Sequence, residues 1–214
     1  MINNTLLSLE TATYGNSSLA IFNGENFIAQ TFLSSGRATS TELLPAVKCL
    51  LQKAGAEKAD IIAVDCGPGS FTGIRVGIAA ARGLADGWKS EIIAISQFDF
   101  YPDMTDEKTK QLVLLDARAG GGFYYELREK DVLFERGFIT PADIFNELIN
   151  PNESVIFCGE FDKKIFQNTE LSHYKIIPEI DAQAVARVAM KNINAGIKNE
   201  VEAIYLHTTV KIPK

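Results

Sequence analysis

The sequence predicts an α/β protein made of two successive lobes, and two features of the chain indicate this class. Residues 18–22 and 27–33 are apolar segments of strand length, and Asn23-Gly24 between them is a strong signal for a hairpin turn. Farther along, short apolar strands alternate with segments whose apolar residues recur at helical spacing. A hairpin followed by alternating helices and strands predicts mixed sheets that are flanked by helices.

The first lobe contains further strands at residues 6–9, 61–65 and 92–95. A helix is expected from Thr41, a suitable N-cap, to Ala54, because Gly55 follows as a stop signal. Its apolar residues form one stripe and extend to a second face: Leu43, Val47, Leu50 and Ala54, then Leu44 and Leu51. Such broad apolar coverage indicates either packing on two sides or a well-buried helix.

The most distinctive segment, residues 66–87, follows the strand at 61–65, which Gly67-Pro68-Gly69 ends. Ser70 or Thr72 can cap the helix that begins there. Its small residues recur every four positions along one stripe: Gly73, Gly77, Ala81 and Ala85. Each interior glycine costs a helix about 1 kcal/mol relative to alanine, so the stripe implies the close approach of another backbone.

Three interpretations of this helix remain open. The stripe can pack against the protein's own sheet. It can instead dock another subunit, with Ile74, Ile78 and Leu84 beside it as larger apolar groups. Finally, the exposed backbone N–H groups at the helix start can bind an anion such as phosphate.

The second lobe begins near residues 101–110, a polar segment with Pro102 and several charges, where we expect the lobe boundary. The lobes would then comprise residues 1–100 and residues 101–214. The second lobe is expected to contain strands at 112–115, 123–128, 132–139, 155–158 and 174–177, and helices at 140–149 and 181–195.

Composition and charge exclude several classes of function. The formal net charge is -6, which argues against direct binding of nucleic acid, because such proteins usually neutralise phosphates with a basic patch. The three cysteines show no Cys-x-x-Cys spacing and are expected to be reduced. The two histidines lie far apart, so no metal site with helical His spacing is expected. The sequence shows neither a signal-peptide pattern nor an apolar stretch of ~20 residues, so we expect a cytoplasmic protein with no membrane contact.

Residues 67–77, Gly-Pro-Gly-Ser-Phe-Thr-Gly-Ile-Arg-Val-Gly, resemble the signature of the TsaB (YeaZ) family. Its members are accessory subunits of the machinery that makes threonylcarbamoyladenosine in tRNA. Asp116-Ala117-Arg118 is similar to a second family motif, and residues 203–207, Ala-Ile-Tyr-Leu-His, resemble the family's closing Pro-x-Tyr-Leu-Arg. The chain departs from the family at Ala203 and His207, and at Glu10, where the family usually has aspartate. The resemblance implies two actin-like lobes of the ASKHA, RNase H-like type.

The resemblance also implies a catalytically inactive subunit, with no catalytic residues of its own. This subunit would bind and activate TsaD, the actin-like catalytic subunit that transfers threonylcarbamoyl to adenosine in tRNA. A TsaE-like ATPase would complete the system, tRNA would be contacted only indirectly, and the isolated protein would form a homodimer through the same helices. The partner or dimer interface would comprise Leu44, Val47, Leu51, Gly73, Ile74, Gly77, Ile78, Ala81, Leu84 and Ala85, and Ala81→Arg would test it.

The first turn of the actin-like fold wraps nucleotide phosphates. A degenerate phosphate site in this chain would comprise Glu10, Thr11, Thr13, Gly69 and Ser70. The extra methylene of Glu10 displaces its carboxylate, which argues against magnesium–nucleotide chemistry here. We therefore expect no cofactor on this chain alone, and ATP or ADP only at the interface with the catalytic subunit.

Two other functions remain open. An autonomous ATP-dependent phosphotransferase of the same fold would need an acidic residue in the second lobe, for which Asp116 is the candidate. Asp116 and Arg118 are also suited to a structural ion pair, which we favour because no acid–base partner is evident. A glycoprotease-like peptidase would use Ser70 as its nucleophile, although Gly-x-Ser-x-Gly is not matched and no histidine motif surrounds it.

Overall fold

The structure is a computed structural model that describes residues 4–14, 17–34, 37–101, 109–117, 121–129, 132–148, 155–160, 173–175, 180–206 and 210–211. The chain divides into two compact units: unit 1 is Met1–Phe100 with Glu179–Tyr205, and unit 2 is Tyr101–Pro178 with Leu206–Lys214. From the sequence, residues 179–205 are expected in the second lobe. This expectation is corrected, because the helix in this segment covers the sheet of unit 1.

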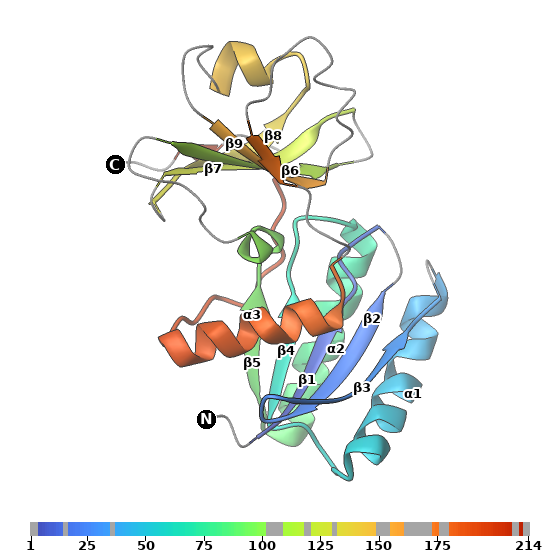
Figure 1. Cartoon of the computed structure of the whole chain (residues 1–214). Coiled ribbons are helices and arrows are strands. Elements are labelled where there is room, and N and C mark those ends of the chain that lie inside the picture. The colour runs from blue at the N-terminus through green and yellow to red at the C-terminus, as the bar shows by residue number, and fades with distance from the viewer. Residues whose placement is uncertain are drawn as a thin grey trace. The chain divides into compact units, whose positions relative to one another are not determined.

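Unit 1 is built on a five-stranded mixed sheet with the strand order β3-β2-β1-β4-β5 (Figure 1). The strands are β1 Thr5–Glu10, β2 Ser18–Asn23, β3 Asn26–Phe32, β4 Ile61–Asp65 and β5 Glu91–Ile95. Neighbours among β1, β2 and β3 are antiparallel, whereas β1, β4 and β5 are parallel. The predicted hairpin is confirmed, because Asn23 pairs with Asn26 and Gly24 adopts a φ of 60°, which favours glycine.

Two helices, α1 Arg37–Ala54 and α2 Phe71–Trp88, pack on one face of this sheet. Alternate strand residues point toward them, as the pleat of a strand requires. The shared core includes Leu7, Leu9, Leu19, Ile21, Ile62 and Val64 from the strands, and Leu43, Val47, Ile74 and Ile78 from the helices. α1 begins before the predicted start at Thr41, and Pro45 lies inside the helix.

The opposite face of the sheet is covered by α3 Ala182–Ala195, which crosses it in Figure 1. Ser8 faces α3, and its Oγ donates to the Ala182 carbonyl oxygen at 2.6 Å. The predicted ends of this helix are confirmed. The Asp181 side chain accepts from Ala184 N as the N-cap, and Gly196 ends the helix with a φ of 69°.

Unit 2 contains a six-stranded mixed sheet with the order β10-β9-β6-β7-β8-β11. Its strands are β6 Lys110–Asp116, β7 Phe123–Glu129, β8 Val132–Ile139, β9 Val155–Glu160, β10 His173–Lys175 and β11 Val210–Lys211. Its core includes Leu112, Leu114, Phe123, Tyr125, Leu127 and Ile139. The helix expected at 140–149 is reduced to one π-helical turn, η2 Ile144–Leu148, within the described residues. None of the helices described in the chain combines the length and hydropathy needed to span a membrane.

Candidate functional site

A tight loop connects β4 to α2. Gly67 adopts a φ of 91°, which favours glycine, and its carbonyl oxygen accepts from Gln97 N at 2.8 Å, at the start of the short helix η1 Gln97–Phe100. Ser70 is the N-cap of α2, because its Oγ accepts from Gly73 N at 3.2 Å. Ser70 therefore has a structural role at the start of the helix.

The small-residue stripe predicted on α2 faces inward. A Cβ at Gly73 would clash with the Thr11 carbonyl oxygen, and a Cβ at Gly69, in the loop before α2, would clash with the Ala12 carbonyl oxygen. A Cβ at Gly77 would likewise meet Thr11 Oγ1. Glycine is needed at these positions because the turn after β1 packs directly on α2. Among the three open interpretations, the structure supports packing within the protein.

Most of the predicted partner interface is wrong, because the residues assigned to it lie in the core of unit 1. Their side chains, or the helix face in the case of glycine, are buried: Val47, Leu51, Ile74, Gly77, Ile78, Ala81 and Ala85. Gly73 lies beneath Thr11, and Leu84 is half-buried. Leu44 on α1 is 56% exposed. Ala81→Arg would place a guanidinium in the core, so this variant would report unfolding and not loss of an interface.

A second row of small residues lies on the solvent side of α2. Ala79, Gly83 and Gly87 recur every four positions and are exposed, and Val76 and Ala80 are half-buried beside them. We call these five residues the outer face of α2. A Cβ at Gly83 or Gly87 would meet nothing within 4 Å, so packing among the described residues does not explain glycine at either position. This row was not predicted, although its residues have the same spacing as those of the inner stripe.

The residues of the predicted phosphate site do come together at the turn after β1. Glu10 Oε1 accepts from Ala12 N and Thr13 N, both at 2.8 Å, and Glu10 Oε2 accepts from Thr13 Oγ1 at 2.9 Å. Ser70 N donates to the Ala12 carbonyl oxygen at 2.7 Å. These donors, which would otherwise serve a phosphate, already have partners within the chain.

Asp65 at the end of β4 lies beside this turn, and both it and Glu10 are fully buried. Burial raises the pKa of Glu10 to about 8, and the nearby Asp65 charge adds to this shift. Burial also raises the pKa of Asp65 to about 7, against the hydrogen bonds from Gly67 N and Gln97 Nε2. The two carboxyl groups form a buried acidic pair whose charged forms are disfavoured.

Two other candidate groups show no reactive setting. Burial raises the pKa of the Cys66 thiol to about 12, which suppresses the reactive thiolate. Asp116 is exposed at the end of β6, while Arg118 and His207 lie outside the described residues. Within the part of the chain that the structure describes, no three His, Cys, Asp or Glu side chains gather as metal ligands.

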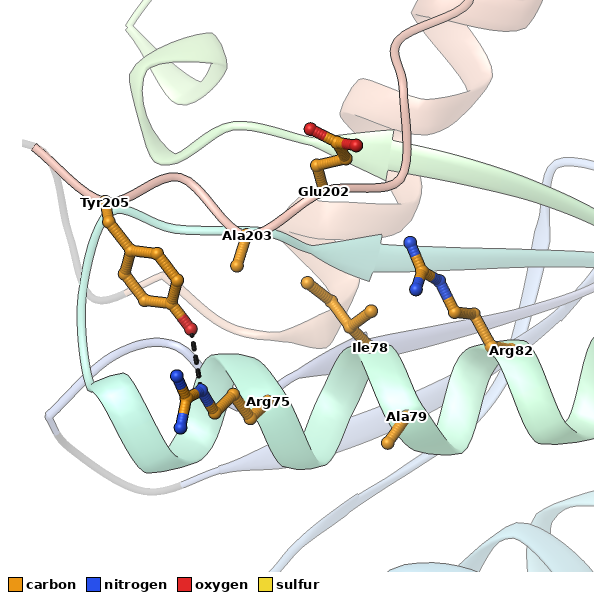
Figure 2. A pocket seen from close by; sticks show the side chains of 7 residues that line it. All are labelled: Arg75, Ile78, Ala79, Arg82, Glu202, Ala203 and Tyr205. Carbon is orange, nitrogen blue, oxygen red and sulfur yellow. Dashed lines mark hydrogen bonds between the residues drawn. The ribbon is translucent and has the colours of Figure 1, made fainter.

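The segment after α3 runs beside α2 and forms a groove with it. Ile204 N donates to the Cys66 carbonyl oxygen at 2.9 Å. Arg75 Nε donates to the Tyr205 hydroxyl at 3.0 Å, as Figure 2 shows. The groove has a volume of about 530 Å³, and we call it the tail groove. It is lined by Arg75, Ile78, Ala79, Arg82, Glu202, Ala203 and Tyr205.

Comparisons with known proteins give relatives along most of the chain. A family model described as "TsaD: tRNA N6-adenosine threonylcarbamoyltransferase" matches residues 33–214. The tRNA threonylcarbamoyladenosine biosynthesis protein TsaB of Haemophilus influenzae is 27% identical, over 98% of this chain and 96% of that protein. The Escherichia coli protein of the same name is 31% identical, over 68% of this chain and 64% of that protein.

Two solved structures share the fold. One is a Pseudomonas aeruginosa protein described as similar to peptidase YeaZ, with a TM-score of 0.69 and 22% identity over 95% of this chain and 99% of that chain. The other, YeaZ from Pseudomonas aeruginosa, has a TM-score of 0.67 and 21% identity over 94% of this chain and 99% of that chain.

The two mixed sheets with flanking helices, together with these structures, confirm the predicted class, a mixed α/β protein with the fold of YeaZ. Within this class, the chain belongs to the TsaB (YeaZ) family, and it also matches the TsaD family model. The resemblance inferred from residues 67–77 is therefore confirmed.

Proposed function

We propose that this protein acts in tRNA threonylcarbamoyladenosine biosynthesis as a non-catalytic subunit that binds and activates a TsaD-like catalytic subunit. The main support is the outer face of α2. Gly83 lies well inside the length of α2 and faces solvent, and a larger side chain there would have open space. At such a position glycine costs the helix about 1 kcal/mol relative to alanine. A partner helix that approaches this face closely would explain the glycine.

The surroundings of the outer face suit such a partner. Val76, Ala79 and Ala80 make the face apolar as well as small, and the neighbouring helix α1 contributes the exposed side chain of Leu44. Small side chains allow two helices to approach to the short end of the usual interaxial distance of about 8–10 Å. The docking surface that we propose is therefore α2 with the adjoining part of α1.

The turn after β1 supports the non-catalytic part of the proposal. A phosphate bound there would have to displace the Glu10 carboxylate from the N–H groups of Ala12 and Thr13. The burial that disfavours the charged forms of Glu10 and Asp65 would also disfavour a phosphate anion at this turn. We accordingly assign ATP or ADP to the contact with the catalytic subunit and not to this turn.

The remaining partners follow from the same proposal. A TsaE-like ATPase completes the system, and the complex acts in the cytoplasm. The net charge of -6 leaves direct binding of tRNA to the other subunits. The isolated protein covers its outer face by forming a homodimer, and the catalytic subunit replaces the second copy.

Reconstituted threonylcarbamoyl transfer tests the proposal, with the TsaD-like subunit and its companions assayed in the presence and absence of this protein. Gly83→Arg should abolish the activation and leave the fold intact, because the new side chain has open space. Asn194→Arg is a matched control, since it adds the same charge to an exposed position of α3. Sedimentation should show that Gly83→Arg, but not Asn194→Arg, is monomeric.

Two results would contradict the proposal. If transfer proceeded equally well without this protein, it would not be an activating subunit. If the purified protein hydrolysed ATP alone and lost this activity with Asp116→Asn, the autonomous phosphotransferase would replace it.

A further inference from the structure

The tail groove places two arginine side chains over an apolar floor. Arg75 and Arg82 are seven positions apart on α2, so their Cα atoms are separated by about 10 Å along the helix axis. Figure 2 shows Ile78 and Ala203 directed toward one another between them. The groove is therefore apolar at its centre and carries a positive charge toward each end.

Both guanidinium groups are held in position by groups of unit 1. The Arg75 guanidinium lies 3.7 Å from the centroid of the Phe71 ring, and its Nε donates to the Tyr205 hydroxyl. Arg82 Nη2 donates to the Val201 carbonyl oxygen. Each of these bonds uses one of five N–H donors, so both side chains retain donors for a ligand. A guanidinium whose orientation is already fixed loses less entropy when it binds a carboxylate.

The charge of the groove identifies the kind of ligand. Among the described lining residues, Arg75 and Arg82 outnumber the acidic Glu202, although the whole chain has a net charge of -6. The Cα atoms of the two arginines are about 10 Å apart along the helix, and the guanidinium groups have different anchors, Tyr205 for Arg75 and Val201 for Arg82, so each is placed to pair with a carboxylate of its own. The spacing suits two carboxylates that are joined by an apolar spacer. The net charge of -6 disfavours a nucleic acid strand, with a phosphate at every nucleotide, more strongly than a short segment that carries two carboxylates.

We propose that the tail groove binds an acidic peptide segment of a partner protein. One carboxylate pairs with Arg75, a second pairs with Arg82, and an apolar side chain between them contacts Ile78 and Ala203. Glu202 opposes binding at the edge of the groove and limits the number of acidic residues that the segment can carry. This site shares Ala79 with the outer face of α2, but Arg75, Arg82 and Glu202, which would recognise the peptide, lie outside that face.

Fluorescence anisotropy with labelled peptides tests this proposal on the full-length protein. The peptides carry two glutamates around a leucine, and the number of residues between the glutamates is varied. Binding should be tightest when the carboxylates are separated by about 10 Å, as in a polyproline II segment with glutamates three residues apart. Either Arg75→Gln or Arg82→Gln should weaken binding at least about tenfold, because a charge-assisted bidentate contact is lost. Glu202→Gln should strengthen it.

Matched controls separate this site from a general charge effect. Lys48→Gln with Lys53→Gln removes two positive charges from exposed positions of α1 and should leave peptide binding unchanged. In the Arg82→Gln variant, replacing the peptide glutamate that pairs with Arg82 by glutamine should have little further effect, since its partner is already absent. Replacing the glutamate that pairs with Arg75 should still weaken binding. Arg75→Lys retains the charge and should bind weakly, because lysine cannot form the bidentate contact.

Three outcomes would overturn the proposal. One is the absence of binding by any peptide of the series to the unmodified protein. Another is a loss of peptide affinity in the Lys48→Gln, Lys53→Gln control that is as large as the loss in the Arg75→Gln or Arg82→Gln variant. The third is Arg75- and Arg82-dependent binding of a single-stranded RNA oligonucleotide in place of the peptides. Circular dichroism of each variant establishes that the fold is retained, and none of the three outcomes bears on activation through Gly83.

Discussion

At the scale of single residues, the buried acidic pair is the least expected feature of unit 1. Glu10 ends β1 and Asp65 ends β4, and because these strands are parallel neighbours, both carboxyl groups lie at the same edge of the sheet. Asp99 adds further negative charge near Asp65. Each carboxyl group accepts hydrogen bonds from the backbone. In the described part of the chain, no positively charged side chain lowers the pKa of either group.

The pair should make stability depend on pH. The pKa of Glu10 rises from 4.5 to about 8 on folding, and that of Asp65 from 3.8 to about 7. The native state then binds more protons than the unfolded state, so the free energy of unfolding should fall as pH rises from about 4 to about 8. Glu10→Gln should reduce this slope and raise stability at pH 8, measured by urea denaturation. The exposed Glu57→Gln should behave as the unmodified protein, and an unchanged slope in Glu10→Gln would contradict the assignment.

Ser70 provides a second test at this scale. Because its Oγ caps α2, Ser70→Ala should lower the free energy of unfolding by about 1 kcal/mol. It should leave the proposed activation of threonylcarbamoyl transfer unchanged under conditions where the protein remains folded. A peptidase that used Ser70 as nucleophile would instead lose its activity completely, so an assay on casein with both proteins separates the two roles.

At the scale of elements, α2 carries two rows of small residues with different causes. The inner row packs on the turn after β1, and the outer row faces solvent. The sequence contained both rows, but the spacing of four was recognised only in the first. Spacing alone cannot distinguish them, because the deciding contact comes from Thr11, which is remote in the sequence. The N-cap, the hairpin and the ends of α3 were predicted correctly, since their signals are local.

One substitution made in both rows should have opposite effects. Gly73→Ala forces a methyl group against the Thr11 carbonyl oxygen, so it should destabilise the protein by about 1–3 kcal/mol. Gly83→Ala meets nothing within 4 Å and should stabilise the isolated protein by up to about 1 kcal/mol, the gain in helix propensity. Urea denaturation measures both. A destabilised Gly83→Ala variant would mean that this glycine has a role inside the fold.

At the scale of the whole molecule, the sequence established the class and the family but not the path of the chain. Residues 67–77 were specific enough to identify the family, and the strands of unit 1 were read from their apolar runs. The assignment of residues 179–205 failed because sequence order does not show that a chain returns to an earlier unit. The signal that indicates this return is Ser8, a polar residue in an apolar strand, which bonds to Ala182.

This return of the chain leads to a prediction about folding. α3 contributes side chains that are buried in unit 1: Ala182, Val185, Ala186, Ala189 and Met190. A fragment of residues 1–100 exposes the sheet face that these side chains cover, so it should aggregate or unfold without a cooperative transition. Joining residues 1–100 to 179–205 through a Gly/Ser linker should restore a single cooperative transition in urea, followed by circular dichroism. The linker is feasible because α3 contacts η1, the last element before the junction. If the fragment of residues 1–100 alone unfolded as cooperatively as the joined chain, α3 would not be required for the folding of unit 1. Residues 1–100, the lobe expected from the sequence, would then be the folding unit.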